Sequence, residues 1–353
     1  MLSIGATQIK LLEKLCNAMS VSGDEGEVRK IVMEQVKPYA DEVKVDSMGS
    51  VLVRKKGTGK KPLCVLLDAH IDEVGFMIVR NSDDGFCEFE VVGGMDKRYL
   101  AGKQVIVGEK HALGVIGTKP IHLMTYSEME HPISFDSLRI DLGPEGSAKV
   151  GDRATFATKF KRVGASIMAK SIDNRIGVAT LIELLKHAPK QIELCLSFSV
   201  QEEIGLRGAR VAGYYFEPDL AVVVDSTPAR DLPDYDGNEN IVYNAKLGEG
   251  PAIYMANLSA IDDQRLVRFL VEIAEKNKIP YQFRQPGGGG TNAGAIQQAR
   301  TGVPVVSVSV PHRYTHSPIS VARVEDWKNT LNLLHCALGK MTRELVNSRY
   351  GNK

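Results

Sequence analysis

Residues 63–72 read LCVLLDAHID. The first half of this stretch is a continuous apolar run, which is typical of a strand buried on both faces in the middle of a sheet. The second half places Asp68, His70 and Asp72 at alternate positions, so their side chains share one face of an extended segment. The stretch therefore predicts a central strand that carries functional groups at its carboxyl end.

Helical and extended patterns alternate on both sides of this strand. Helices are expected at residues 7–19, 28–36, 174–187, 262–277 and 293–299, and again from Val324 onward. Extended apolar segments lie at residues 192–200, 220–225, 281–284 and 303–310. This alternation predicts the α/β fold class, with a three-layer α/β/α domain and a mostly parallel sheet.

The pattern changes between Val74 and Val163. This part of the chain holds short extended segments separated by Gly, Asp and Pro, and it has no long helical period. Short strands with such turn signals are typical of a small β-barrel or sandwich. The sequence thus predicts an α/β domain formed by residues 1–73 and 165–353, interrupted by an inserted small β-barrel domain at residues 74–164.

The composition limits the classes of partner. The chain of 353 residues has 44 Lys and Arg against 43 Asp and Glu, a formal charge of +1, so it has no overall field for nucleic acid or an anionic membrane. The N-terminus does not resemble a signal peptide, and no apolar run approaches the ~18 residues of a membrane span. We therefore expect a cytoplasmic protein without nucleic-acid or membrane partners.

The cysteines give no sign of a disulfide framework. There are five of them, and they never form a CxxC motif: Cys16, Cys64, Cys87, Cys195 and Cys336. Scattered cysteines in an odd number are interpreted as buried, reduced thiols, not as disulfides or a zinc-finger site.

Polar side chains also mark the ends of other predicted elements. Glu202 and Glu203 end one strand, Asp225 ends another, His316 follows a third, and Asp173 directly precedes a helix. Each has an ordinary explanation when taken alone, such as a helix cap or a solvated loop. Because functional groups in open α/β sheets gather at the carboxyl ends of strands, their joint occurrence predicts one shared crevice.

The residue types in this crevice suit two divalent metal ions. Imidazole and carboxylate are ligands of Zn²⁺ and its neighbours, and two ions about 3.5–4 Å apart need a carboxylate that bridges them. Five protein ligands satisfy that count and leave a second glutamate free as a general base. Asp72 can accept a hydrogen bond from the non-ligating nitrogen of His70. The expected cofactor is two divalent ions per subunit, zinc first, with cobalt or manganese as alternatives.

Six segments carry a family resemblance, and they occur in this order: LDAHIDEVGFMI, SIDNRIG, VQEEIGLRGA, VVDS, GGGGTNAGAI and RYTHSP. Together they resemble the co-catalytic metallo-aminopeptidases of the glutamyl-aminopeptidase, or TET, family, over nearly the whole chain. The resemblance implies a hydrolase that removes N-terminal amino acids from peptides. It also implies an inserted β domain and the self-association of dimers into a hollow dodecamer.

The resemblance implies a role for each metal ligand. Asp173 would bridge the two metals. His70 and Asp225 would complete one metal site, and Glu203 and His316 would complete the other.

The resemblance also implies the catalytic and substrate-binding residues. Glu202 would be the general base, and Asp72 would orient His70. The wall near the first side chain of the substrate would include four consecutive residues: Gly289, Gly290, Thr291 and Asn292. Asn292 stands where family members commonly have Asp, so a weaker preference for basic N-terminal residues is expected.

Other functions remain as alternatives. A glycoside hydrolase needs two carboxyl groups that face each other across the scissile bond and no metal. A non-catalytic scaffold of the same fold is the second alternative. The glycine run at residues 287–290 partly fits a dinucleotide fingerprint, but no acidic residue follows from Thr291 through Arg323 to bind a ribose.

Overall fold

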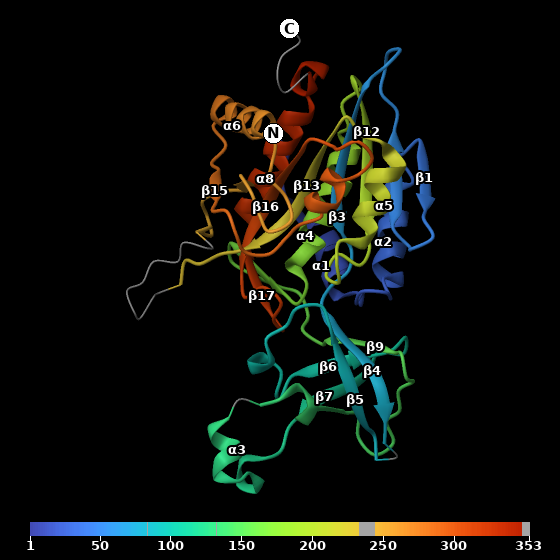
Figure 1. The fold of residues 1–353 in the computed structure, drawn as a ribbon, viewed down its shortest axis with the longest axis vertical. Helices are drawn as coiled ribbons and strands as arrows, with labels where there is room; N and C mark the ends of the chain where they lie inside the picture. The colour runs from blue at the N-terminus through green and yellow to red at the C-terminus, as the bar shows by residue number, and fades with distance from the viewer. Residues whose placement is uncertain (83, 132, 233–243, 348–353) are drawn as a thin grey trace.

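The computed structural model describes residues 1–82, 84–131, 133–232 and 244–347 (Figure 1). A large α/β domain lies above a smaller β domain in this view, and the two are joined near the ends of β3 and β4. The predicted fold class is confirmed, including the layers of helices on both faces of the large sheet.

The large sheet has a parallel centre. In spatial order its middle strands are β12 (Ile192–Ser199), β3 (Leu63–His70), β13 (Leu220–Pro228) and β16 (Val305–Arg313). The flanking strands are antiparallel: β1 (Glu42–Val45) and β2 (Val51–Lys55) beside β12, and β17 (Ser320–Arg323), β11 (Ser166–Ala169) and β10 (Lys161–Val163) beside β16. A short pair, β14 (Ala252–Tyr254) and β15 (Gln282–Arg284), also joins β16. The carboxyl ends of the four middle strands therefore meet at one edge.

Helices cover both faces of this sheet. One face packs against α1 (Ala6–Asn17), α2 (Gly26–Val36), α4 (Ile172–Lys186), α6 (Gln264–Asn277) and α8 (Val324–Leu338). The other packs against α5 (Arg207–Phe216) and α7 (Ala293–Gln297). Because side chains alternate along a strand, Val65 and Leu67 of β3 enter the first core and Leu66 enters the second. His70 therefore points to the same face of β3 as Leu66 and Cys64.

The smaller domain is a closed antiparallel barrel. Its strands are, in spatial order, β4 (Gly75–Asn81), β5 (Phe86–Val92), β8 (Arg139–Asp141), β7 (Ala112–Gly117), β6 (Gln104–Val107) and β9 (Arg153–Phe156). The barrel has a core of its own, in which the ring of Phe76 meets those of Phe89 and Phe156 edge to face. A separate core of this kind is what an inserted domain requires.

Some elements were not expected from the sequence. They include β14, β17, the short helix α3 (Tyr126–Glu130) and four 3₁₀ turns: η1 (Lys97–Tyr99), η2 (Ile121–Leu123), η3 (Phe135–Ser137) and η4 (Arg343–Val346). These segments are too short to show a period, and tertiary contacts determine their conformation. The predicted domain boundaries stay predictions. The barrel strands fall inside residues 74–164, and β10 at the end of that range pairs with β11 in the large sheet.

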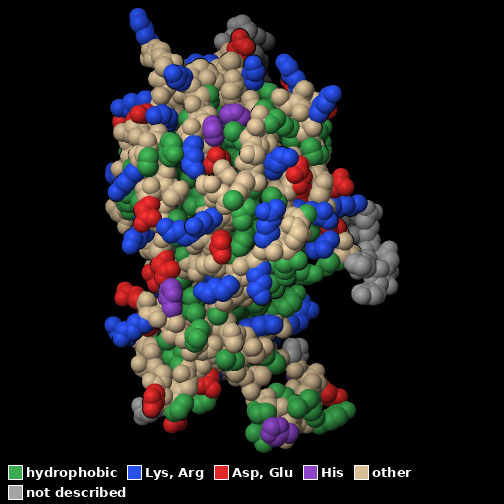
Figure 2. All heavy atoms as spheres, turned by 180° about the vertical axis from the view of Figure 1, so that it is seen from behind, with side chains coloured by type: hydrophobic (Ala, Val, Ile, Leu, Met, Phe, Trp, Pro, Cys, Tyr) green, Lys and Arg blue, Asp and Glu red, His purple; other side chains and the backbone are tan. Residues whose placement is uncertain are grey.

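The region around α3 exposes an apolar surface, which we call the α3 patch. Figure 2 shows hydrophobic side chains gathered on this lobe, at the lower right. The patch consists of four largely exposed residues: Ile121, Leu123, Tyr126 and Met129. Among the described residues, no helix has both the length and the apolar character needed to cross a membrane.

Candidate metal centre and active site

The predicted site residues lie around one cavity of about 490 Å³ at the carboxyl edge of the parallel strands. This volume falls within the range of small-molecule sites. Nine of the predicted residues line it, and six of these are the expected metal ligands and general base: His70, Asp173, Glu202, Glu203, Asp225 and His316. They come from the ends of β3, β12, β13 and β16 and from the first turn of α4. We call this group of six the metal centre.

Asp173 lies between the two histidines. Its Oδ1 atom is 3.2 Å from His70 Nε2, and its Oδ2 atom is 3.5 Å from His316 Nε2. The Asp225 carboxylate is 3.7 Å from His70 Nε2, and the Glu203 carboxylate is 3.2 Å from His316 Nε2. The two oxygens of Asp173 therefore face two separate groups, each with one histidine and one further carboxylate.

These two groups have the composition of metal sites. In each of them the possible ligand atoms lie within 4.8 Å of one another. Glu203 Oε1 is buried without a hydrogen-bond partner among the described residues, although a buried carboxylate oxygen normally has one. Imidazole together with carboxylate suits Zn²⁺ and related divalent ions. The donor set thus fits a pair of divalent cations.

Asp72 holds both His70 and the glutamate pair in position. Its carboxylate lies 3.4 Å from His70 Nδ1, and its backbone carbonyl oxygen lies 3.2 Å from the same nitrogen. The carboxylate also accepts hydrogen bonds from the backbone N–H groups of Glu202 and Glu203, at 3.0 and 3.1 Å, and from the Ser22 hydroxyl at 2.6 Å. The contacts with the two glutamates were not predicted. One buried aspartate therefore contacts both His70 at the end of β3 and the loop after β12.

The pKa values show how concentrated the negative charge is. Burial raises the pKa of Glu202 well above its usual value, and the nearby carboxylates of Glu203 and Asp225 raise it further, against the opposing effect of His70. Burial alone would lower the pKa of His316, but Glu203 and Asp173 raise it to about 11. The clustered carboxylates therefore favour a positive charge in this cavity.

The comparisons with known proteins agree with this geometry. Residues 49–333 match the family model described as M42 glutamyl aminopeptidase. The chain belongs to the M42 glutamyl aminopeptidase family. It is therefore a hydrolase that acts as an aminopeptidase, and the family resemblance noted in the sequence is confirmed.

Individual M42 relatives are similar over nearly their full length. The lysyl aminopeptidase of Pyrococcus furiosus is 32% identical over 348 residues, which cover 94% of this chain and 97% of that protein. The structure of a TET aminopeptidase from the marine sediment archaeon Thaumarchaeota archaeon SCGC AB-539-E09 has a TM-score of 0.91 at 33% identity, covering 96% of this chain and 98% of that one.

Two further solved structures bear on assembly and on activity. The TET1 peptidase of Pyrococcus horikoshii, described as assembling into a tetrahedron or a large octahedral shell, has a TM-score of 0.83 at 31% identity and covers 95% and 100% of the two chains. A Thermotoga maritima chain with the name endoglucanase has a TM-score of 0.77 at 29% identity and covers 95% and 98%.

Other side chains of this M42 site were not anticipated. Tyr254 and Arg284 line the cavity, and the Arg284 guanidinium lies 4.6 Å from the centre of the Tyr254 ring. Arg284 Nε donates a hydrogen bond of 2.9 Å to Thr227 Oγ1. Both residues come from the short paired strands β14 and β15. The sequence predicted the extended segment at residues 281–284 but not β14, and it did not indicate that either side chain faces the cavity.

The predicted substrate-binding residues divide into two groups. Gly289, Gly290 and Thr291 line the cavity. Asn292 is buried instead, and its Nδ2 atom donates hydrogen bonds to Asp68 at 2.6 Å and to the Ser199 hydroxyl at 2.9 Å. Burial raises the pKa of Asp68 to about 6, although these hydrogen bonds lower it. Asn292 thus contacts Asp68, near the carboxyl end of β3, and is not one of the described residues that line the cavity.

Proposed function

We propose that this M42 aminopeptidase removes single N-terminal residues from peptides with the help of two divalent cations at the metal centre. The observation that carries this proposal is the position of Asp173, whose two oxygens face two histidine-carboxylate groups. Asp173 would bridge the ions, His70 and Asp225 would hold one, and Glu203 and His316 would hold the other. When bound, the ions would polarise the scissile carbonyl and acidify a water molecule.

The residues of the chain supply the proton transfer. We assign Glu202 as the general base, which takes a proton and returns it to the leaving amine. Burial raises the pKa of Glu202, which makes its carboxylate a better proton acceptor and supports this role. Asp72 keeps the backbone of Glu202 fixed through the hydrogen bond to its N–H group.

The ligand set also limits the choice of metal. Nitrogen and oxygen donors suit Zn²⁺, Co²⁺ and Mn²⁺, and availability selects among these ions. We propose zinc first, with cobalt or manganese as alternatives. The glycines and Thr291 of the cavity wall would contact the substrate, while the neutral, buried Asn292 adds no charge for a basic side chain.

We further propose that the chain assembles with copies of itself in the cytoplasm. A TET relative assembles into a tetrahedron or an octahedral shell. The α3 patch supports contacts of this kind, since contiguous exposed apolar surface marks interaction sites. Residues 74–164 would then serve dimerisation and assembly, from dimer to dodecamer, without a nucleic-acid or membrane partner.

Two alternatives remain for the reaction. A glycoside hydrolase would use two carboxyl groups and no metal. The clustered histidines disfavour it, because that reaction has no need of them. A non-catalytic scaffold is disfavoured by Glu202, which a binding protein would not need beside the five metal ligands.

One assay distinguishes the metal-dependent aminopeptidase from the glycoside hydrolase and the non-catalytic scaffold. The protein is treated exhaustively with a chelator, then supplied with Zn²⁺, Co²⁺ or Mn²⁺, and tested on Lys, Leu and Glu chromogenic amides and on a β-glucan. Loss of amide hydrolysis and its recovery with metal is expected. Glucan hydrolysis that survives chelation would favour the glycosidase, and a clear preference for Lys would contradict the expectation for Asn292.

A further inference from the structure

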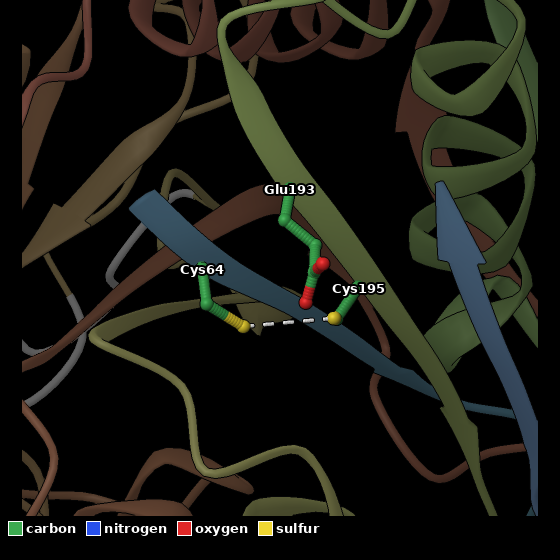
Figure 3. Close-up of side chains that lie close together, drawn as sticks. All are labelled: Cys64, Glu193 and Cys195. Carbon is green, nitrogen blue, oxygen red and sulfur yellow. Dashed lines mark hydrogen bonds between the residues drawn. The ribbon is translucent and has the colours of Figure 1, made fainter. Parts of the chain in front are cut away.

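A second cluster of metal-binding side chains lies away from the metal centre. Cys64 is near the start of β3, and Cys195 and Glu193 are on the neighbouring strand β12. Figure 3 shows the three side chains close together, with the two sulfur atoms joined by a dashed line. Glu193 is directly paired with Cys64 in the parallel register, and Cys195 is paired with Leu66. We call this group the thiol cluster.

The distance between the sulfur atoms suits a bound metal ion. The two Sγ atoms are 3.7 Å apart, and both lie within 4.8 Å of a Glu193 carboxylate oxygen. In a tetrahedral zinc site with Zn–S bonds of about 2.3 Å, two sulfurs are about 3.8 Å apart. The thiols thus already have the spacing of two thiolate ligands.

The same register argues against a disulfide. Cys64 and Cys195 are two positions out of step on adjacent strands, which puts their Cα atoms roughly 8 Å apart from strand spacing and rise alone. Disulfides usually need about 4.4–6.8 Å. All five cysteines are free in the structure, and Cys64 and Cys336 are half-buried where buried thiols were expected.

The residues around the thiol cluster balance the charge of a bound ion and leave the cluster open to solvent. The Arg54 guanidinium donates a hydrogen bond to the Glu193 carboxylate and lies 5.5 Å from the centre of the Phe216 ring. A divalent cation with two thiolates, one carboxylate and this arginine is electrically neutral. Cys195 is buried, but Cys64 is half-buried and the Glu193 side chain is 21% exposed, so an ion can enter from solvent.

We propose that Cys64, Cys195 and Glu193 form a separate site for one thiophilic divalent cation of the Zn²⁺ class, with water as the fourth ligand. Binding converts two thiols into thiolates and releases two protons to the solvent. Because both thiols must lose a proton to bind the ion, binding strengthens as pH rises.

The role of this site is structural. Cys64 and His70 lie six residues apart on β3, roughly 20 Å along an extended strand, so the ion takes no part in hydrolysis. It joins β3 to β12 at the end of the sheet opposite the metal centre. Its occupancy therefore raises the free energy of unfolding and leaves peptide hydrolysis unchanged.

Cobalt provides a selective probe of the thiol cluster in the intact enzyme. The metal centre offers only nitrogen and oxygen ligands, so a sulfur-to-cobalt charge-transfer absorption reports the thiol cluster alone. We expect titration of the full chain with Co²⁺ to give this absorption, with one fewer metal bound per chain in Cys64→Ser and Cys195→Ala. Cys336→Ser is a matched control at a half-buried cysteine of α8. It should keep both the charge-transfer absorption and the full number of bound metal ions.

Two further measurements complete the test. Glu193→Gln, which keeps both thiols, should weaken Co²⁺ binding at this site at least about tenfold, because even groups that only support a metal ligand contribute that much. Absence of the charge-transfer absorption in the unaltered protein would overturn the proposal, as would its persistence in Cys64→Ser. Loss of two thiols to an internal disulfide on mild oxidation would also contradict the geometry.

Discussion

Two groups of buried charged side chains are neighbours in this molecule. They differ in how the desolvation cost of their charges is offset. The metal centre gathers four carboxylates around two histidines. The neighbouring group, which we call the Glu73 cluster, pairs one carboxylate with two cations. Lys170 Nζ lies 2.5 Å from both oxygens of Glu73, and Arg175 Nη2 lies 3.3 Å from one of them. Asp72, which contacts His70, Glu202 and Glu203, directly precedes Glu73 in the chain.

The Glu73 cluster has the properties of a group that stabilises the fold, whereas the metal centre has those of a functional site. Glu73 also accepts hydrogen bonds from Ser20 N–H and from the Thr155 hydroxyl, so its carboxylate is well supplied with donors. The metal centre instead has an excess of negative charge and an unpartnered Glu203 oxygen. Charge that the protein does not balance is costly unless a ligand balances it. The unbalanced group is therefore the one for which we propose metal binding and catalysis.

The largest effect is expected at the metal centre, in Glu202→Gln. This change removes proton transfer and leaves all five proposed ligands, so kcat should fall about 10²- to 10⁴-fold. Metal analysis of the purified variant should find the content of the unaltered enzyme. Turnover close to normal would show that Glu202 is not the base.

The next effect is expected in the Glu73 cluster, in Lys170→Met. Removing one partner leaves a buried charge poorly compensated, so the free energy of unfolding should fall by about 3–5 kcal/mol. Denaturant titration measures this loss. Lys328→Met is the control, because Lys328 and Glu325 form an exposed pair whose removal should change stability by less than about 1 kcal/mol. Equal losses in the two variants would remove the distinction between the pairs.

Most of this contrast could not be predicted from the sequence. The alternation of Asp68, His70 and Asp72 and the polar strand ends indicated the metal centre, because periodicity along a strand is local information. Lys170 and Glu73 are 97 positions apart, and nothing in their neighbourhoods marks them as a pair. Asn292 was expected at the substrate and lies against Asp68, since a glycine-rich turn gives no indication of which side chain faces inward.

A buried carboxyl group can also avoid the cost of a buried charge by staying protonated. Asp262 allows this third case to be tested. Its Oδ1 accepts a hydrogen bond from Ser307 N–H at 2.5 Å, while its buried Oδ2 has no partner among the described residues. Burial raises the pKa of Asp262 to about 6, against the opposing hydrogen bonds.

The sign of the pH dependence follows from this raised pKa. The unfolded chain ionises Asp262 near pH 4 and the folded one near pH 6, so its contribution to stability is lost as pH rises across this window. Asp262→Asn keeps the acceptor and cannot ionise. Relative to the unaltered protein, the variant should gain up to about 3 kcal/mol between pH 4 and pH 6, as measured by denaturant titration at each pH. A difference independent of pH would show that Asp262 is ionised throughout.

The smallest effect is expected at Asp72, the residue that borders both groups. Asp72→Asn keeps the size of the side chain but replaces one acceptor oxygen with an amide donor, which cannot accept from the N–H groups of both Glu202 and Glu203. Because Asp72 supports the ligands without belonging to them, metal affinity should fall about 10- to 100-fold. Competition with a chelator of known affinity measures this loss, and saturating metal should restore much of the activity. If unfolding changed as strongly as in Lys170→Met while metal affinity stayed constant, Asp72 would belong energetically to the Glu73 cluster and not to the metal centre.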